Sequence, residues 1–83
     1  MGFGLSTAFE PTAEDVCAAA AVIGAPMDID TAEIYLKYLG AEDREVISRV
    51  ALQAEDLDHQ TEAAQEKIVD FMRRDGFVAW PSM

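Results

Sequence analysis

The first 36 residues of the sequence contain no lysine and no arginine, although they contain six acidic residues. The whole chain of 83 residues has 16 acidic and 6 basic side chains, so its formal net charge is −10. This charge repels the phosphates of DNA, RNA and anionic lipids, and it attracts basic protein surfaces. The scarcity of positive charge therefore argues against direct nucleic-acid or membrane binding. It predicts a partner protein with a basic surface, which includes nucleic-acid-binding proteins.

Cysteine is almost absent, and so are the patterns of an active site. Cys17 is the only cysteine, so no internal disulfide can form, and a reducing compartment such as the cytoplasm fits best. No basic neighbour activates its thiol. The sequence also has no nucleophile elbow, no glycine-rich phosphate loop and no apolar run of the roughly 20 residues that span a membrane. We expect a protein that is not an enzyme and has no cofactor.

Histidine is equally scarce, because His59 is the only one. Asp56 and His59 have the i, i+3 spacing of carboxylate and histidine ligands in di-metal helical bundles. Such a site also needs a second histidine and carboxylates from other helices. Only a homo-oligomer would duplicate the set, and the oligomeric state is left open. We interpret His59 as an exposed residue at a helix junction and predict no metal site.

Strand signals are lacking, and the apolar spacing indicates an all-α fold. We expect a single domain, a small bundle of about four short antiparallel helices with an extended N-terminal arm and a short apolar C-terminal tail. The boundary near residue 58 is left open, since the last two helices would also fit one kinked helix. The predicted segments are the arm 1–11, helices at about 13–23, 31–39, 42–57 and 59–75, and the tail 76–83.

Capping residues and glycines are expected at the ends of these helices. Thr12 is the expected N-cap of the first helix, either Asp28 or Asp30 that of the second, and Asp58 that of the last. Glycines are expected to end three helices; they are Gly24, Gly40 and Gly76. Because many apolar residues are alanine, we expect the core to depend on a few larger side chains. They are Ile23, Ile34, Leu36, Leu39, Val46, Ile47, Val50, Ile68, Phe71 and Met72.

One short segment has a familiar pattern. Leu39-Gly40-Ala41-Glu42-Asp43 precedes an amphipathic helix in a small acidic chain, and it resembles the attachment site of acyl carrier proteins. In that family a serine of this motif carries phosphopantetheine. Asp43 stands at the serine position, so the match ends at the residue that carries the chemistry. The chain is not assigned to that family.

Two hypotheses about function follow. The first is a non-enzymatic protein–protein interaction module that binds a basic surface, by analogy with small phage-encoded inhibitors whose helical carboxylates imitate nucleic acid. The alternative is a small structural or accessory subunit of a viral or multi-subunit assembly, docked through its apolar termini. The residues expected to bind a partner are Glu10, Glu14, Asp15, Asp28, Asp30, Glu33, Glu55, Asp56, Asp58, Glu62 and Trp80.

Overall fold

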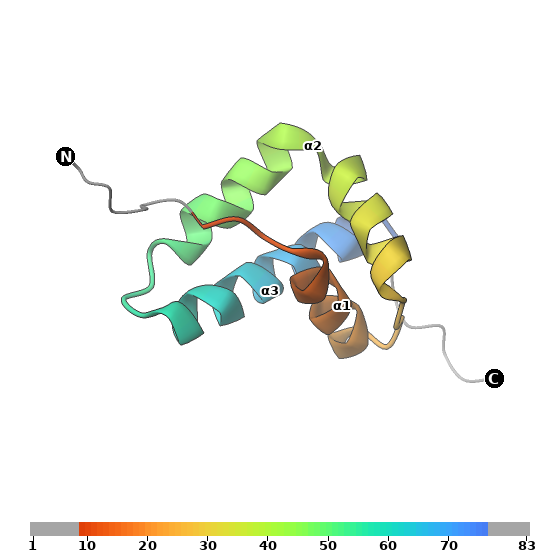
Figure 1. Cartoon of the computed structure of the whole chain (residues 1–83), viewed down its shortest axis with the longest axis horizontal. Helices are drawn as coiled ribbons and strands as arrows, with labels where there is room; N and C mark the ends of the chain where they lie inside the picture. Colours follow the sequence, from red (N-terminus) through yellow and green to blue (C-terminus); the bar gives the residue numbers. More distant parts are fainter. Residues whose placement is uncertain (1–8, 77–83) are drawn as a thin grey trace.

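Three helices pack against one another in the computed structural model, which describes residues 9–76 (Figure 1). They are α1 (Ala13–Val22), α2 (Ile29–Ala51) and α3 (Leu57–Arg74). Between residues 9 and 76 there is no strand, which confirms the all-α class. The count of about four helices is wrong, because α2 continues past Gly40. Residues 1–8 of the expected arm and 77–83 of the expected tail, with Trp80, lie outside the described residues.

The start of α1 is a complete capping box, as the sequence suggested. The Asp15 backbone N–H donates to the Thr12 hydroxyl oxygen at 3.3 Å, and the Thr12 backbone N–H donates to the Asp15 carboxylate at 3.0 Å. Two of the otherwise unpaired N–H groups of the helix start are thereby satisfied. At the other end Ile23 is the C-cap and Gly24 has φ 76°. Thr12 and Gly24 therefore bound α1 as predicted.

Aspartates also cap the other two helices. The Asp28 carboxylate accepts the Thr31 N–H at 2.8 Å, which selects Asp28 from the two predicted candidates. At α3 the cap is Asp56, which accepts the His59 N–H at 2.9 Å. The prediction of Asp58 as cap is therefore wrong, because the helix begins earlier and Asp58 lies in its first turn. The turn after Ala51 separates α2 from α3, so these two helices are not one kinked helix.

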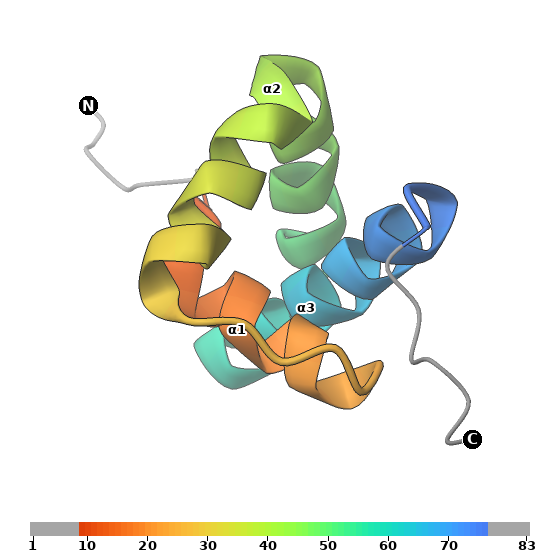
Figure 2. The same cartoon turned by 90° about the vertical axis from the view of Figure 1, so that its right-hand side faces the viewer.

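Helix α2 bends at Gly40, and its two halves point in different directions (Figures 1 and 2). Gly40 has φ 78° and ψ 174°, a conformation that is essentially restricted to glycine. The Arg44 side chain donates from Nε to the Gly40 carbonyl oxygen at 3.0 Å. This bond satisfies a carbonyl near the bend, where regular helical pairing is interrupted. Gly40 thus interrupts the regular helical backbone, as predicted, and the two halves of α2 join across a bend at this residue.

The end of α3 connects both halves of the bent helix. Tyr35, before the bend, donates its hydroxyl to the Asp75 carboxylate at 3.0 Å. Arg74 donates to Asp43, after the bend, at 3.1 Å and to Asp75 at 3.0 Å. Burial, reinforced by the bond to Asp75, raises the pKa of Tyr35. The Arg74 hydrogen bond holds the pKa of Asp75 below its ordinary value. We call Tyr35, Asp43, Arg74 and Asp75 the bend network.

Alanines allow the three helices to approach closely. Ala19, Ala32, Ala51 and Ala64 are fully buried, and between them they come from all three helices. Six predicted core residues are buried around them: Ile23, Leu39, Ile47, Ile68, Phe71 and Met72. Three more are half-buried: Leu36, Val46 and Val50.

Ile34 is an incorrect core prediction. Its side chain is 68% exposed, because the buried line of the first half of α2 runs through Ala32, Tyr35 and Leu39. One residue corresponds to about 100° of rotation around a helix, which turns Ile34 away from that line. Among the described helices, none is both long enough and apolar enough to cross a membrane.

Replacing Gly40 by L-alanine is expected to destabilise the fold. The positive φ strains any L-residue, and no atom lies within 4 Å of the added Cβ, so the penalty is conformational. We expect a loss of about 1–3 kcal/mol in the free energy of unfolding, measured by urea denaturation. The matched control is D-alanine at residue 40, introduced by chemical synthesis, since a D-residue adopts this φ without strain. Equal stabilities of the two variants would contradict this interpretation of the bend.

Candidate functional site

Four carboxylates form a stripe along the exposed side of α3. Asp58, Glu62, Glu66 and Asp70 follow one another at i, i+4 spacing, and all four are exposed. We call this set the α3 acidic stripe. A rise of 1.5 Å per residue separates successive members by roughly 6 Å along the axis. Along one DNA strand, a phosphate and the next but one are a similar distance apart, roughly 7 Å along the helix axis.

The stripe is unfavourable for the helix that carries it. Like charges at i, i+4 destabilise a helix by roughly 0.2–0.5 kcal/mol per pair, and this stripe contains three successive pairs. Sequence reasoning selected Asp58 and Glu62 but missed Glu66 and Asp70. The signal that would have found them is the i, i+4 repeat of acids on the predicted helix. Asp58 lies in the first turn, where the helix dipole favours negative charge, but Glu62, Glu66 and Asp70 lie beyond it.

His59 lies at the start of this stripe and forms an ion pair. Its Nδ1 is 2.8 Å from both carboxylate oxygens of Asp56, and both side chains are exposed. The hydrogen bond to Asp56 raises the pKa of His59 above its ordinary 6.5, and nearby Glu62 and Asp58 act in the same direction. Hydrogen bonds from His59 lower the pKa of Asp56 below 3.8. Among residues 9–76, no three His, Cys, Asp or Glu side chains are placed to hold a metal ion.

The other predicted binding residues are dispersed, and one of them is inaccessible. Asp15 is only 8% exposed, and its carboxylate accepts from Thr12 and from Gln65 of α3. We therefore correct its assignment: Asp15 caps α1 and contacts α3. Glu10 and Glu14 are exposed near the start of α1, whereas Asp28, Asp30 and Glu33 are exposed at the start of α2. Glu55 is exposed in the turn before α3.

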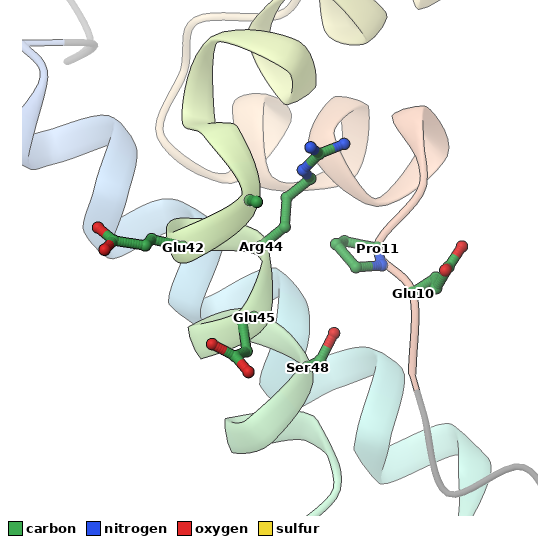
Figure 3. Close-up of a pocket in the computed structure, with 7 residues that line it drawn as sticks. Glu10, Pro11, Glu42, Arg44, Glu45 and Ser48 are labelled. Atoms are coloured by element: carbon green, nitrogen blue, oxygen red, sulfur yellow. The ribbon is translucent and has the colours of Figure 1, made fainter.

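A groove of about 550 Å³ opens between residues 10–11 and the second half of α2 (Figure 3). The Ser48 hydroxyl donates to the Phe9 carbonyl beside it, and Arg44 is bound to the Gly40 carbonyl. Figure 3 shows the carboxylates of Glu42 and Glu45 pointing away from Pro11. The residues that line the groove are Glu10, Pro11, Ala41, Glu42, Arg44, Glu45 and Ser48.

The groove adds acidic surface. Its carboxylates point in different directions (Figure 3). The Ser48 hydroxyl already donates to a backbone carbonyl, with no base beside it among the described contacts. Glu42 and Glu45 were not among the predicted binding residues, because their proximity to Glu10 depends on how residues 9–11 pass over α2.

Several of the few basic side chains are engaged within the fold. Arg74 pairs with Asp43 and Asp75, and Arg49 lies 3.6 Å from Glu45. Lys67 lies over the Phe71 ring, 5.3 Å from its centroid. The following carboxylates are exposed and have no ion-pair or hydrogen-bond partner among residues 9–76: Glu10, Glu14, Asp30, Glu33, Glu42, Glu55, Asp58, Glu62, Glu66 and Asp70. The surface excess of negative charge is therefore larger than the pairing inside the fold can neutralise.

Comparisons of the chain with protein-family models, curated proteins and solved structures found no match. The chemistry of the described residues is therefore the basis for assigning a function.

The His59–Asp56 pair is expected to be visible in an NMR titration. The His59 ring should titrate above 6.5, and Asp56→Asn should return its pKa toward that value while still capping α3, because asparagine is an equally good N-cap. The raised His59 pKa adds stability that is lost as the pH rises through it. The lowered Asp56 pKa adds stability that is lost as the pH falls through it. Both contributions are present between about pH 3.8 and 6.5. Identical His59 titrations in the two proteins would disprove the pair.

Glu66→Lys is expected to stabilise the protein. It replaces two repulsive i, i+4 pairs, with Glu62 and with Asp70, by attractive ones, so the free energy of unfolding should rise by about 1 kcal/mol at low salt. Glu66→Gln is the matched control, and it should give about half of that gain because it only removes repulsion. Raising the salt concentration should reduce both gains. Urea denaturation measures them, and a destabilised Glu66→Lys variant would refute the repulsion.

Proposed function

We propose that this protein is a non-enzymatic interaction module that binds a basic surface of a partner protein through the α3 acidic stripe. The supporting observation is the stripe itself: it consists of four exposed carboxylates at one-turn intervals, and no basic residue interrupts this i, i+4 series. A basic surface would neutralise their mutual repulsion on binding. The repulsion that destabilises the free helix would be relieved in the complex, and this relief would favour binding.

The spacing of the stripe also supports a more specific proposal. A basic surface that binds nucleic acid is built to meet a regular row of phosphates. A rigid helix that carries carboxylates at roughly 6 Å intervals offers a similar row. We therefore propose that the partner is a nucleic-acid-binding protein and that this chain inhibits it by occupying its nucleic-acid site. This step rests on charge and spacing, since no sequence motif supports it.

The alternative role, as an accessory subunit docked through its apolar termini, depends on Phe3, Leu5 and Phe9 of the arm and on Phe77, Val78 and Trp80 of the tail. Phe9 packs against the hydrophobic core of this chain. The other five residues lie outside the described part of the chain, and no described contact favours that role over the first. It remains the second hypothesis from the sequence.

Binding to a labelled oligolysine tests the electrostatic part of the proposal. We expect affinity to fall about tenfold or more between low and physiological salt. Glu62→Lys with Glu66→Lys should abolish binding measured by fluorescence anisotropy. The control, Glu10→Lys with Glu42→Lys, makes the same change in net charge at the groove and should retain most of the affinity. Equal losses in both variants would mean that net charge alone matters, and would refute the stripe as the site.

The inhibitory part is tested on the natural partner. Affinity purification of the tagged protein from its host at two salt concentrations should retain a basic protein only at the lower one. Duplex DNA added to that complex should displace the tagged protein, because both ligands would occupy one surface. A partner that binds DNA and this protein simultaneously would rule out inhibition by mimicry.

A further inference from the structure

Two large apolar side chains are exposed next to each other on the first half of α2. Ile34 is 68% exposed and Tyr38, one helical turn later, is 67% exposed. With Thr31 and Tyr35 they line a shallow apolar hollow of about 270 Å³. Pockets for small molecules usually measure about 300–1,000 Å³, so this hollow better fits protein side chains than a metabolite. We call Thr31, Ile34, Tyr35 and Tyr38 the α2 apolar patch.

The patch is held in place by the fold beneath it. The Tyr38 ring stacks on the Tyr35 ring, with centroids 5.9 Å apart and planes 25° from parallel. Tyr35 is only 4% exposed, and its hydroxyl donates to Asp75, which Arg74 also binds. Because the exposed Tyr38 ring already stacks on this buried ring, it should lose little conformational entropy when a partner covers it. Tyrosine is also among the residues that most often dominate binding energy at interfaces.

Acidic residues border the patch. Asp30 precedes Ile34 by one helical turn, and Glu33 is adjacent to it; both are exposed. Lys37 is the only basic residue in the first half of α2. A second copy of the chain would bring two sets of these carboxylates together, and two chains of net charge −10 repel each other. The charge around the patch therefore favours a basic occupant over a second copy.

We propose that the α2 apolar patch is the docking surface for the apolar face of a basic amphipathic helix of the partner protein. A leucine-like side chain of that helix enters the hollow against Ile34 and Tyr38. Its lysine or arginine side chains meet Asp30 and Glu33. This proposal rests on the proposed function, because it takes a basic partner as given, but it assigns a second surface that uses apolar contact as well as charge.

Two synthetic peptides of identical leucine and lysine composition serve as probes. One has its leucines at helical spacing, and in the other the order is permuted so that no apolar helical face exists. At physiological salt we expect the first peptide to bind at least about tenfold more tightly, because the apolar contact is not screened. Tyr38→Ser and Ile34→Ser should each weaken the first peptide about tenfold and leave the permuted peptide unchanged. Val22→Ser, at a residue that is 70% exposed on α1, is the matched control and should change neither affinity.

The outcomes separate this proposal from the proposed function. If oligolysine binds to the stripe but Tyr38→Ser and Ile34→Ser leave the amphipathic peptide unaffected, the proposed function stands and the patch is refuted. If the amphipathic peptide binds through the patch and oligolysine does not bind, the stripe is refuted and the patch stands. Two results show another occupant and overturn the proposal. The first is a dimer in sedimentation that Tyr38→Ser dissociates. The second is a blue-shifted emission of Trp80, the only tryptophan, that Tyr38→Ser shifts to the red.

Discussion

The bend network is the interaction on which the rest of the structure depends. Its hydrogen bonds join the end of α3 to residues on both sides of Gly40: Tyr35 before the bend and Asp43 after it. Without the bend, a straight α2 would direct one of these two residues away from Arg74 and Asp75. The same network orders the Tyr35 ring against which Tyr38 stacks. One non-helical glycine and two residues at the end of α3 thus determine both the path of the chain and the shape of its exposed apolar surface.

The acidic residues divide into two groups with different physical roles. Asp15, Asp28 and Asp56 satisfy backbone N–H groups at the starts of the three helices, where the helix dipole also favours negative charge. In the α3 acidic stripe only Asp58 lies in a first turn, and the i, i+4 repulsion between its members destabilises the helix. Capping and internal pairing together involve six of the 16 acidic residues. The other ten are exposed and have no ion-pair or hydrogen-bond partner among residues 9–76.

Local chemistry was predictable from the sequence, and tertiary context was not. Thr12, Gly24 and Gly76 act as predicted because capping depends on neighbours in the chain. Aspartate is a favoured N-cap residue, and Asp56 and Asp58 are both aspartates near the start of α3, so local sequence could not decide which of them is the cap. The exposure of Ile34 could not be predicted either. Ile34 is more hydrophobic than Ala32, yet Ala32 is fully buried and Ile34 is 68% exposed, because the packing of the three helices determines which side of α2 faces the core. Similarly, the i, i+4 acids of α3 were readable in the sequence, whereas the groove beside Glu10 required the folded chain.

The bend at Gly40 also determines which groups the end of α3 can contact. Tyr35 and Asp43 are eight residues apart, so in a straight helix they would lie roughly 12 Å apart along the axis and roughly 80° apart around it. The positive φ of Gly40 changes the direction of the chain between them, and both side chains contact the end of α3 within one molecule. These two contacts between distant parts of the chain therefore depend on the backbone conformation of one residue.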